Sequence, residues 1–113
     1  MHEVAISQGL MELLESEQRK RGFSAIRRVV LRLGAFSHVE PEALRFGFEV
    51  ASRGTIADGA SLDIDIVPAD AWCMRCSHGV MLSGRGDPCP DCGSHQLITQ
   101  GGEEMRLAEM EVL

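Results

Sequence analysis

Two closely spaced pairs of cysteines are the feature that most limits what this chain can fold into. Cys73, Cys76, Cys89 and Cys92 are arranged as C-x2-C-x12-C-x2-C. Each pair forms a turn that can direct two thiolates at one ion, and two such turns make a tetrahedral four-sulfur site. The segment CPDCG supplies the rigid proline and the permissive glycine that these turns use. Two disulfides are the alternative, which an oxidising compartment would favour.

The spacing predicts the role of the metal better than its identity. Zn(II) is expected because it binds four thiolates tightly and is inert to redox change, while iron in a rubredoxin-like site has the same ligand pattern and stays open. Four protein ligands leave no open coordination position, so the ion would be structural. It would hold together residues 68–100, a zinc-ribbon-like module whose own apolar surface is too small for folding.

Composition excludes several classes of protein. The 113 residues suit one domain, or one small domain with an insert, and 44% hydrophobic with 25% charged residues is typical of globular chains. The formal net charge of -6 argues against nucleic acid as a partner, because such binders present a basic face. No apolar run approaches the roughly 18 residues that span a bilayer, and the start of the chain lacks the features of a signal peptide. We therefore expect a cytoplasmic protein that does not enter the membrane.

Two segments have the apolar spacing of amphipathic helices. The first runs from about Glu3 to Arg21, with apolar residues at intervals of three and four. The second begins at Pro41, which suits the first turn of a helix, and ends at Arg53-Gly54. Its apolar stripe consists of Leu44, Phe48 and Ala51.

Three segments alternate with the period of strands: Ile26–Leu33, Ser61–Val67 and Met105–Leu113. In the first, Val29, Leu31 and Leu33 are expected on one face and Arg28, Val30 and Arg32 on the other. In the second, Leu62, Ile64 and Ile66 share a face, and Asp63 and Asp65 are placed to face the two arginines. The third strand returns to the same sheet. The prediction is an α+β domain of two helices and about three mainly antiparallel strands, built from residues 1–67 and 101–113, with residues 68–100 inserted.

The amino terminus is the second unusual feature. We expect Met1 to be retained, because trimming generally requires a small second residue. The α-amine, the His2 amide and the His2 imidazole can then form fused chelate rings around Ni(II) or Cu(II), and Glu3 can add a carboxylate. A solvated terminal histidine is the alternative. Chemistry alone therefore indicates only a candidate site for a divalent metal.

Four other residues are candidates for smaller roles. His38 lies in a turn near Glu40, where it could assist metal capture or bond a local backbone group. His78 and His95 flank the cysteine pairs and could tune that site or be solvated. Phe46 falls on a different helix face from the apolar stripe and is a candidate protein contact.

Catalytic motifs are lacking. The chain contains no nucleophile motif, no glycine-rich phosphate loop and no paired carboxylate beside a convincing base, so we expect a protein that is not an enzyme. From the residues alone, a zinc-ribbon adaptor that binds other proteins, with an inert amino terminus, competes with a metal carrier.

Three stretches in the same order resemble the HypA/HybF family of hydrogenase maturation proteins: MHEVAIS, LRLGAFSHVEPEALRFGFEVASRGT, and CMRC with PCPDCGS. The resemblance covers essentially the whole chain, except that the stretch SGRGDP between the cysteine pairs matches no family motif. It implies a nickel metallochaperone for [NiFe]-hydrogenase, with some members also serving urease.

The resemblance also implies which residues hold which metal. His2 becomes the principal ligand of Ni(II), the transferred cargo, with Glu3 beside it and the Met1 amine as a further donor. The nickel-binding domain becomes residues 1–67 plus 101–113, and the four cysteines hold Zn(II). The expected partners are a HypB-type GTPase, the [NiFe]-hydrogenase large subunit and, for members that serve urease, urease accessory proteins. The chain would be a monomer or a homodimer.

Overall fold

The computed structural model describes residues 2–113, with side chains from Val4 onward. The chain divides into two compact units. One comprises residues up to Leu31, Val39–Ile64 and Leu107–Leu113, and the other comprises Arg32–His38 and Asp65–Arg106. The elements follow one another as α1 (His2–Arg21), β1 (Ile26–Gly34), α2 (Pro41–Ser52), β2 (Ser61–Val67), β3 (Ala69–Cys73), β4 (His78–Leu82), β5 (Leu97–Thr99) and β6 (Met105–Val112).

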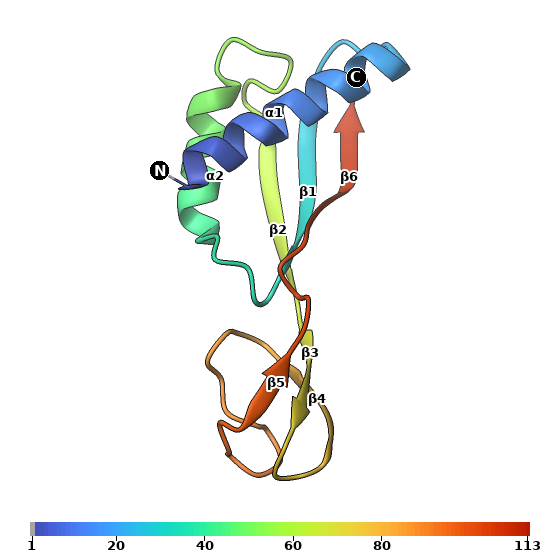
Figure 1. The fold of residues 1–113 in the computed structure, drawn as a ribbon. Helices are drawn as coiled ribbons and strands as arrows, with labels where there is room; N and C mark the ends of the chain where they lie inside the picture. The colour runs from blue at the N-terminus through green and yellow to red at the C-terminus, as the bar shows by residue number, and fades with distance from the viewer. Residues whose placement is uncertain (1) are drawn as a thin grey trace. The chain divides into compact units, whose positions relative to one another are not determined.

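The first sheet has the strand order β2-β1-β6, so the predicted third strand does return to it. β6 runs antiparallel to β1: the Leu113 N–H donates to the Ala25 carbonyl, and the Gly34 N–H donates to the Glu104 carbonyl. β1 and β2 run in the same direction, because α2 brings the chain back before β2 begins (Figure 1). The predicted α+β class with mainly antiparallel strands is confirmed, and β1–β2 is the parallel exception among the described strands.

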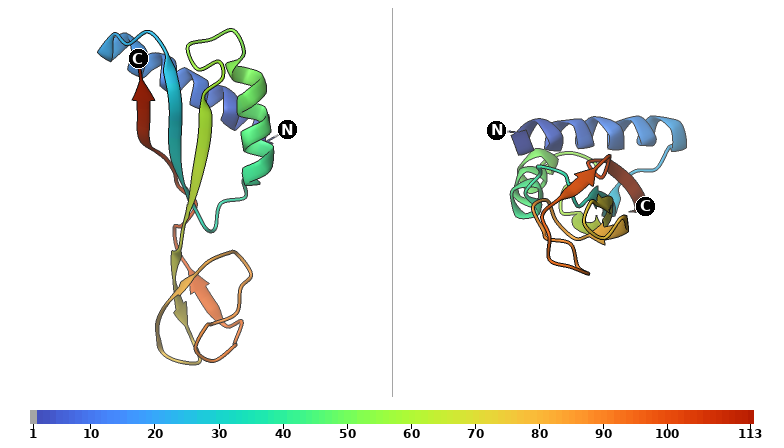
Figure 2. Two further views of the ribbon diagram at one scale, coloured as in Figure 1. Left: turned by 180° about the vertical axis from the view of Figure 1, so that it is seen from behind. Right: turned by 60° about the horizontal axis from the view of Figure 1, so that its bottom comes forward.

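Both helices of the first unit cover the same face of this sheet (Figure 2). Their apolar stripes meet β1 and β2 in one core of fully buried side chains, among them Leu10, Leu14, Val29, Leu44 and Phe48. α2 begins as predicted, with Pro41 at its first position and the Glu40 side chain accepting a hydrogen bond from the Glu42 N–H. This core holds the start of α1 against α2.

Three details of the predicted strands differ. Val30 was expected on the polar face but is only 5% exposed, because β1 is the central strand and is flanked on both sides. Ile66 was expected on the buried face but is 46% exposed, since the core of the first unit ends at Ile64. Of the two expected charge pairs, the described residues form only Arg28–Asp63, at 2.6 Å. That hydrogen bond raises the pKa of Arg28.

The second unit is built on a second antiparallel sheet, with strand order β4-β3-β5. Its small core combines alanines and two cysteines with Val80, Leu82 and Phe36, and Phe36 is contributed from outside residues 68–100. Sequence patterning identified none of these three strands. The compact unit around the cysteines thus also takes in residues 32–38, 65–67 and 101–106. Which metal each unit holds stays a prediction.

Neither helix in the described chain is long and apolar enough to cross a membrane.

Candidate metal centre

The four cysteines lie on two turns with the same local geometry. Cys73 ends β3, and the Ser77 N–H donates to its carbonyl at 2.8 Å; in the second turn the Gly93 N–H donates to the Cys89 carbonyl, also at 2.8 Å. The residue after each pair has a positive φ, 58° at Ser77 and 75° at Gly93. The left-handed conformation is easy for glycine, which explains the glycine of CPDCG. Each turn therefore brings two sulfurs to the same side.

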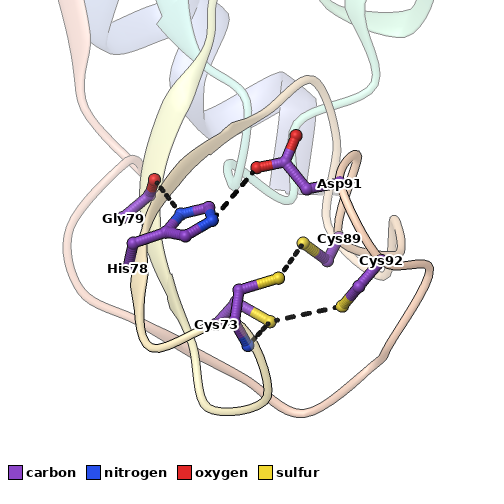
Figure 3. A network of polar contacts seen from close by, with 7 residues as sticks. Cys73, His78, Gly79, Cys89, Asp91 and Cys92 are labelled. Carbon is purple, nitrogen blue, oxygen red and sulfur yellow. Dashed lines mark hydrogen bonds and ion pairs between the residues drawn. The ribbon is translucent and has the colours of Figure 1, made fainter.

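The two turns bring all four sulfur atoms together. The ligand atoms of Cys73, Cys76, Cys89 and Cys92 all lie within 4.8 Å of one another. The Sγ atoms of Cys73 and Cys92 are 3.6 Å apart, and those of Cys76 and Cys89 are 3.9 Å apart (Figure 3). Thiolates placed about 2.3 Å from a central ion at the corners of a tetrahedron are separated by about 3.8 Å. The sulfur cage thus has the size that one tetrahedral ion needs, and the cysteines are free thiols.

The surroundings of the cage favour thiolate at one position. The backbone N–H of Cys76 donates to the Cys73 sulfur at 3.3 Å, which lowers the pKa of Cys73 to about 7. Hydrogen bonding to the neighbouring sulfurs, above all to that of Cys92, raises the pKa of Cys76, and burial of the thiol raises it further. Cys73 and Cys89 are buried, whereas Cys76 and Cys92 are partly exposed. A cation at the centre would remove the repulsion that opposes four thiolates.

His78 connects the two cysteine turns at their outer side. Its Nε2 lies 3.3 Å from a carboxylate oxygen of Asp91, which sits between Cys89 and Cys92, and its Nδ1 lies 3.0 Å from the Gly79 carbonyl oxygen (Figure 3). His95 is exposed, and His38 is also exposed, in a different segment of the second unit. None of the three histidines is among the residues that cluster around the sulfurs within the described chain.

Sequence reasoning missed the contacts of the SGRGDP stretch. Arg85 reaches the Phe36 carbonyl oxygen with Nε at 3.1 Å and Nη2 at 2.7 Å, and Nη2 also lies 2.8 Å from a Glu103 carboxylate oxygen. The guanidinium also lies over the Phe36 ring, 5.7 Å from its centroid. The stretch is therefore held in place rather than loose. Spacing alone gives no signal for a contact between residues 49 positions apart.

The predicted nickel ligands lie outside the part of the chain whose side chains are described. The backbones of His2 and Glu3 are in the first turn of α1, and Met1 precedes the described residues. The roles of His2, Glu3 and the Met1 amine stay predictions.

The chain is similar to hydrogenase maturation factors along its whole length. It is 51% identical over 112 residues to hydrogenase maturation factor HypA 2 of Bradyrhizobium diazoefficiens, with 99% of each chain covered. It is also 51% identical over 112 residues to hydrogenase maturation factor HypA of Methylocella silvestris, again with 99% of each chain covered. The solution structure of the Ni metallochaperone HypA from Helicobacter pylori matches 98% of this chain and 97% of its own, with a TM-score of 0.67 at 28% identity.

The family model described as hydrogenase/urease nickel incorporation, metallochaperone, hypA matches residues 1–112. The expectation that the chain is not an enzyme agrees with this description of a metallochaperone and with the relatives, which are maturation factors. The chain belongs to the HypA family of nickel-incorporation metallochaperones.

Proposed function

We propose that this chain binds Ni(II) at its amino terminus and delivers it during the maturation of [NiFe]-hydrogenase, while Zn(II) held by the four cysteines is structural. The observation that carries the proposal is the closed sulfur cage, whose four ligand atoms all lie within 4.8 Å of one another. Four thiolates fill a tetrahedral coordination sphere, so this centre offers no open position from which cargo can be handed on. A nickel carrier therefore needs a second donor set.

The proposed donors for nickel are the His2 nitrogens, the Met1 amine and the Glu3 carboxylate. Nitrogen donors in one plane suit Ni(II) better than Zn(II), so geometry would select the cargo. A transfer site should also release its ion, and every additional 1.4 kcal/mol or so of affinity makes release about tenfold less favourable. A few exchangeable donors at a chain end meet both requirements.

Zn(II) is the proposed occupant of the sulfur cage. Its d10 shell imposes no geometry of its own, and its thiolate sites are inert to redox change. Rubredoxin-like iron would use the same four ligands, but it would give the protein a visible absorption that zinc lacks. Elemental analysis of the purified protein, together with its visible spectrum, separates the two metals.

The proposed partners are those that the resemblance to the HypA/HybF family implies. The chain has no glycine-rich phosphate loop, so any nucleotide hydrolysis during delivery comes from another protein, and we propose a HypB-type GTPase. The recipient would be the [NiFe]-hydrogenase large subunit, with urease accessory proteins as the alternative route. We place these steps in the cytoplasm, with the chain acting as a monomer or a homodimer.

The test is a nickel titration of zinc-loaded protein with an untagged amino terminus, run beside His2→Gln. We expect about one nickel per chain in the wild type and a loss of that site in the variant, with zinc content unchanged in both. Equal nickel binding by the two proteins would reject His2 as the ligand. The zinc-ribbon adaptor would then be the better description of the chain.

A further inference from the structure

An apolar groove lies between α1 and α2, at the end of α1 where the chain begins. Its volume is about 350 Å³, and its walls are formed by Val4 and Gln8 on α1 and by Phe46 and Val50 on α2. The side chains of Val4, Phe46 and Val50 are 48%, 66% and 47% exposed. Three large apolar side chains are thus exposed around one hollow.

Small residues form the floor of the groove. Ala43, Gly47 and Ala51 follow one another at intervals of four along α2, which places them on one line of the helix surface. A hollow floored by small residues and walled by larger ones can receive the ridge of side chains of another helix.

The exposed residues of the groove do not serve the fold of their own unit. The core side of α2 is formed by Leu44 and Phe48, which are 0% and 1% exposed, and Phe46 lies away from it. An aromatic side chain that stays in water while its neighbours are buried is typical of a protein contact, because aromatic anchors dominate binding energy in interfaces.

An acidic border lies on the α1 side of the groove. Glu12 and Glu15 continue the line of Val4 and Gln8 along α1, and both are exposed. Within the described residues, neither of the two glutamates forms an ion pair. On α2, Glu49 lines a different hollow, on the far side of Phe46. The border on α1 is therefore acidic.

We propose that this groove binds an amphipathic helix of a partner protein in the nickel-delivery reaction. The helix would insert apolar residues at positions i, i+3 or i+4, and i+7, and would carry lysines or arginines on its flanks opposite the acidic border. The inference rests on the proposed function for the role of the partner. Because Val4 follows His2 by two residues, a helix in the groove occupies the end of α1 that carries the proposed nickel ligand.

The first experiment measures binding of the purified HypB-type GTPase and of the purified hydrogenase large subunit to the zinc-loaded chain by calorimetry. The test variant is Phe46→Ser with Val50→Ser, and the control is Leu13→Ser. Leu13 is 40% exposed but points away from the groove on α1. We expect at least tenfold weaker binding of one of the two partners by the double variant and no change for the control. Unchanged affinity for both partners would overturn the proposal.

A charge-reversal variant tests the acidic border of the groove without changing its apolar walls. Glu12→Lys with Glu15→Lys leaves the groove intact and is expected to weaken the same complex severalfold at low salt, with a smaller effect at high salt. An increase in affinity, or no change, would show that the partner is not basic at this site.

A photo-reactive benzoylphenylalanine at position 46 identifies what lies in the groove of the complex. Attachment to a basic amphipathic helix of the partner supports the proposal. Attachment to a second copy of this chain, or to an acidic or non-helical segment, would overturn it.

The nickel titration described above, repeated on the Phe46 and Val50 variant, separates the groove proposal from the proposed function. Loss of docking with intact nickel binding concerns the groove alone. Absent nickel binding in the wild type would reject the proposed function.

Discussion

Arg85 binds the carbonyl oxygen of Phe36 through two of its nitrogens, at 3.1 and 2.7 Å, and thereby joins the loop between the cysteine pairs to a segment that lies far before them in the chain. Phe36 is 1% exposed and packs against Cys73 and Cys89 in the same core. The backbone N–H of Phe36 in turn donates to the Gly102 carbonyl at 2.8 Å. Three separate segments of the second unit are thus held together at Phe36.

Replacing Arg85 by glutamine should loosen this junction without emptying the cysteine site. Hydrogen bonds to a charged group contribute about 1.5–3 kcal/mol, but the Arg85 side chain is 45% exposed, so we expect a loss of about 1 kcal/mol. Hydrogen exchange should become faster at the Phe36 amide and in the loop around Gly86, while zinc content stays the same. Arg106→Gln, which removes an exposed arginine with no ion pair in the described chain, is the control. Equal exchange rates in both variants would contradict a role for Arg85.

Gly102 should tolerate no side chain. Its φ is +77°, and a Cβ at this position would lie 2.6 Å from the Ala69 Cβ and 2.6 Å from a Phe36 ring carbon. A left-handed backbone costs an L-residue about 1–2 kcal/mol, and an overpacked core costs about 1–3 kcal/mol more. We expect Gly102→Ala to lower the free energy of unfolding by about 3 kcal/mol in urea denaturation.

Gly101→Ala is the matched control for this steric argument. Its φ of +73° is nearly the same, but a Cβ there would meet only the flexible end of Glu104, at 3.4 Å. The variant should lose only the backbone contribution of about 1–2 kcal/mol. If the two glycine variants were equally destabilised, backbone conformation alone would explain the result, and the close approach to Phe36 would be irrelevant.

Two phenylalanines on α2, two residues apart, should respond very differently to truncation. Phe48 is 1% exposed in the core of the first unit, so Phe48→Ala should cost about 3–5 kcal/mol. Phe46 is 66% exposed, and Phe46→Ala should change stability by less than about 0.5 kcal/mol. Thermal unfolding followed by helical circular dichroism measures both. A large loss in the Phe46 variant would mean that the residue serves the fold and is not free for a partner.

Sequence patterning predicted the first unit well because its elements are long and have one buried face. The stripe of Leu44 and Phe48 and the alternation around Val29 both report burial directly. The same reasoning failed at Val30 and Ile66, whose burial depends on which strands and helices lie beside them. Which strands and helices lie beside a residue is determined by the tertiary structure, and it produces no pattern in the local sequence.

The strands of the second unit could not be identified from the sequence because their inward-facing residues are small. β3 does alternate, with Ala69, Ala71 and Cys73 buried and the residues between them exposed, but alanine and cysteine carry little hydrophobic signal. The cysteine spacing nevertheless predicted the four-sulfur cluster, because a tetrahedral site requires only two turns that meet. The contribution of Phe36 could not be foreseen, since nothing in the sequence links it to residues 68–100.

Removal of the metal should unfold the second unit and leave the first one folded. The core of the second unit contains two of the four cysteines and only three larger apolar side chains, Phe36, Val80 and Leu82, so its apolar burial is small without the ion. The first unit has its own larger core, formed by both helices. A chelator, or Cys73→Ser, should therefore abolish the cooperative unfolding of the second unit.

One residue allows the unfolding of the second unit to be measured separately from that of the helices. Trp72 is the only tryptophan of the chain and lies on β3, so its fluorescence follows the second unit, while circular dichroism at helical wavelengths follows α1 and α2. After chelation we expect a changed Trp72 emission with nearly unchanged helical signal, and recovery when Zn(II) is added back. His95→Ala, which alters an exposed neighbour of the cysteine turn, should keep both the metal and the emission. Simultaneous loss of both signals would mean that the two units fold as one, and no change in either would show that the metal has no structural role.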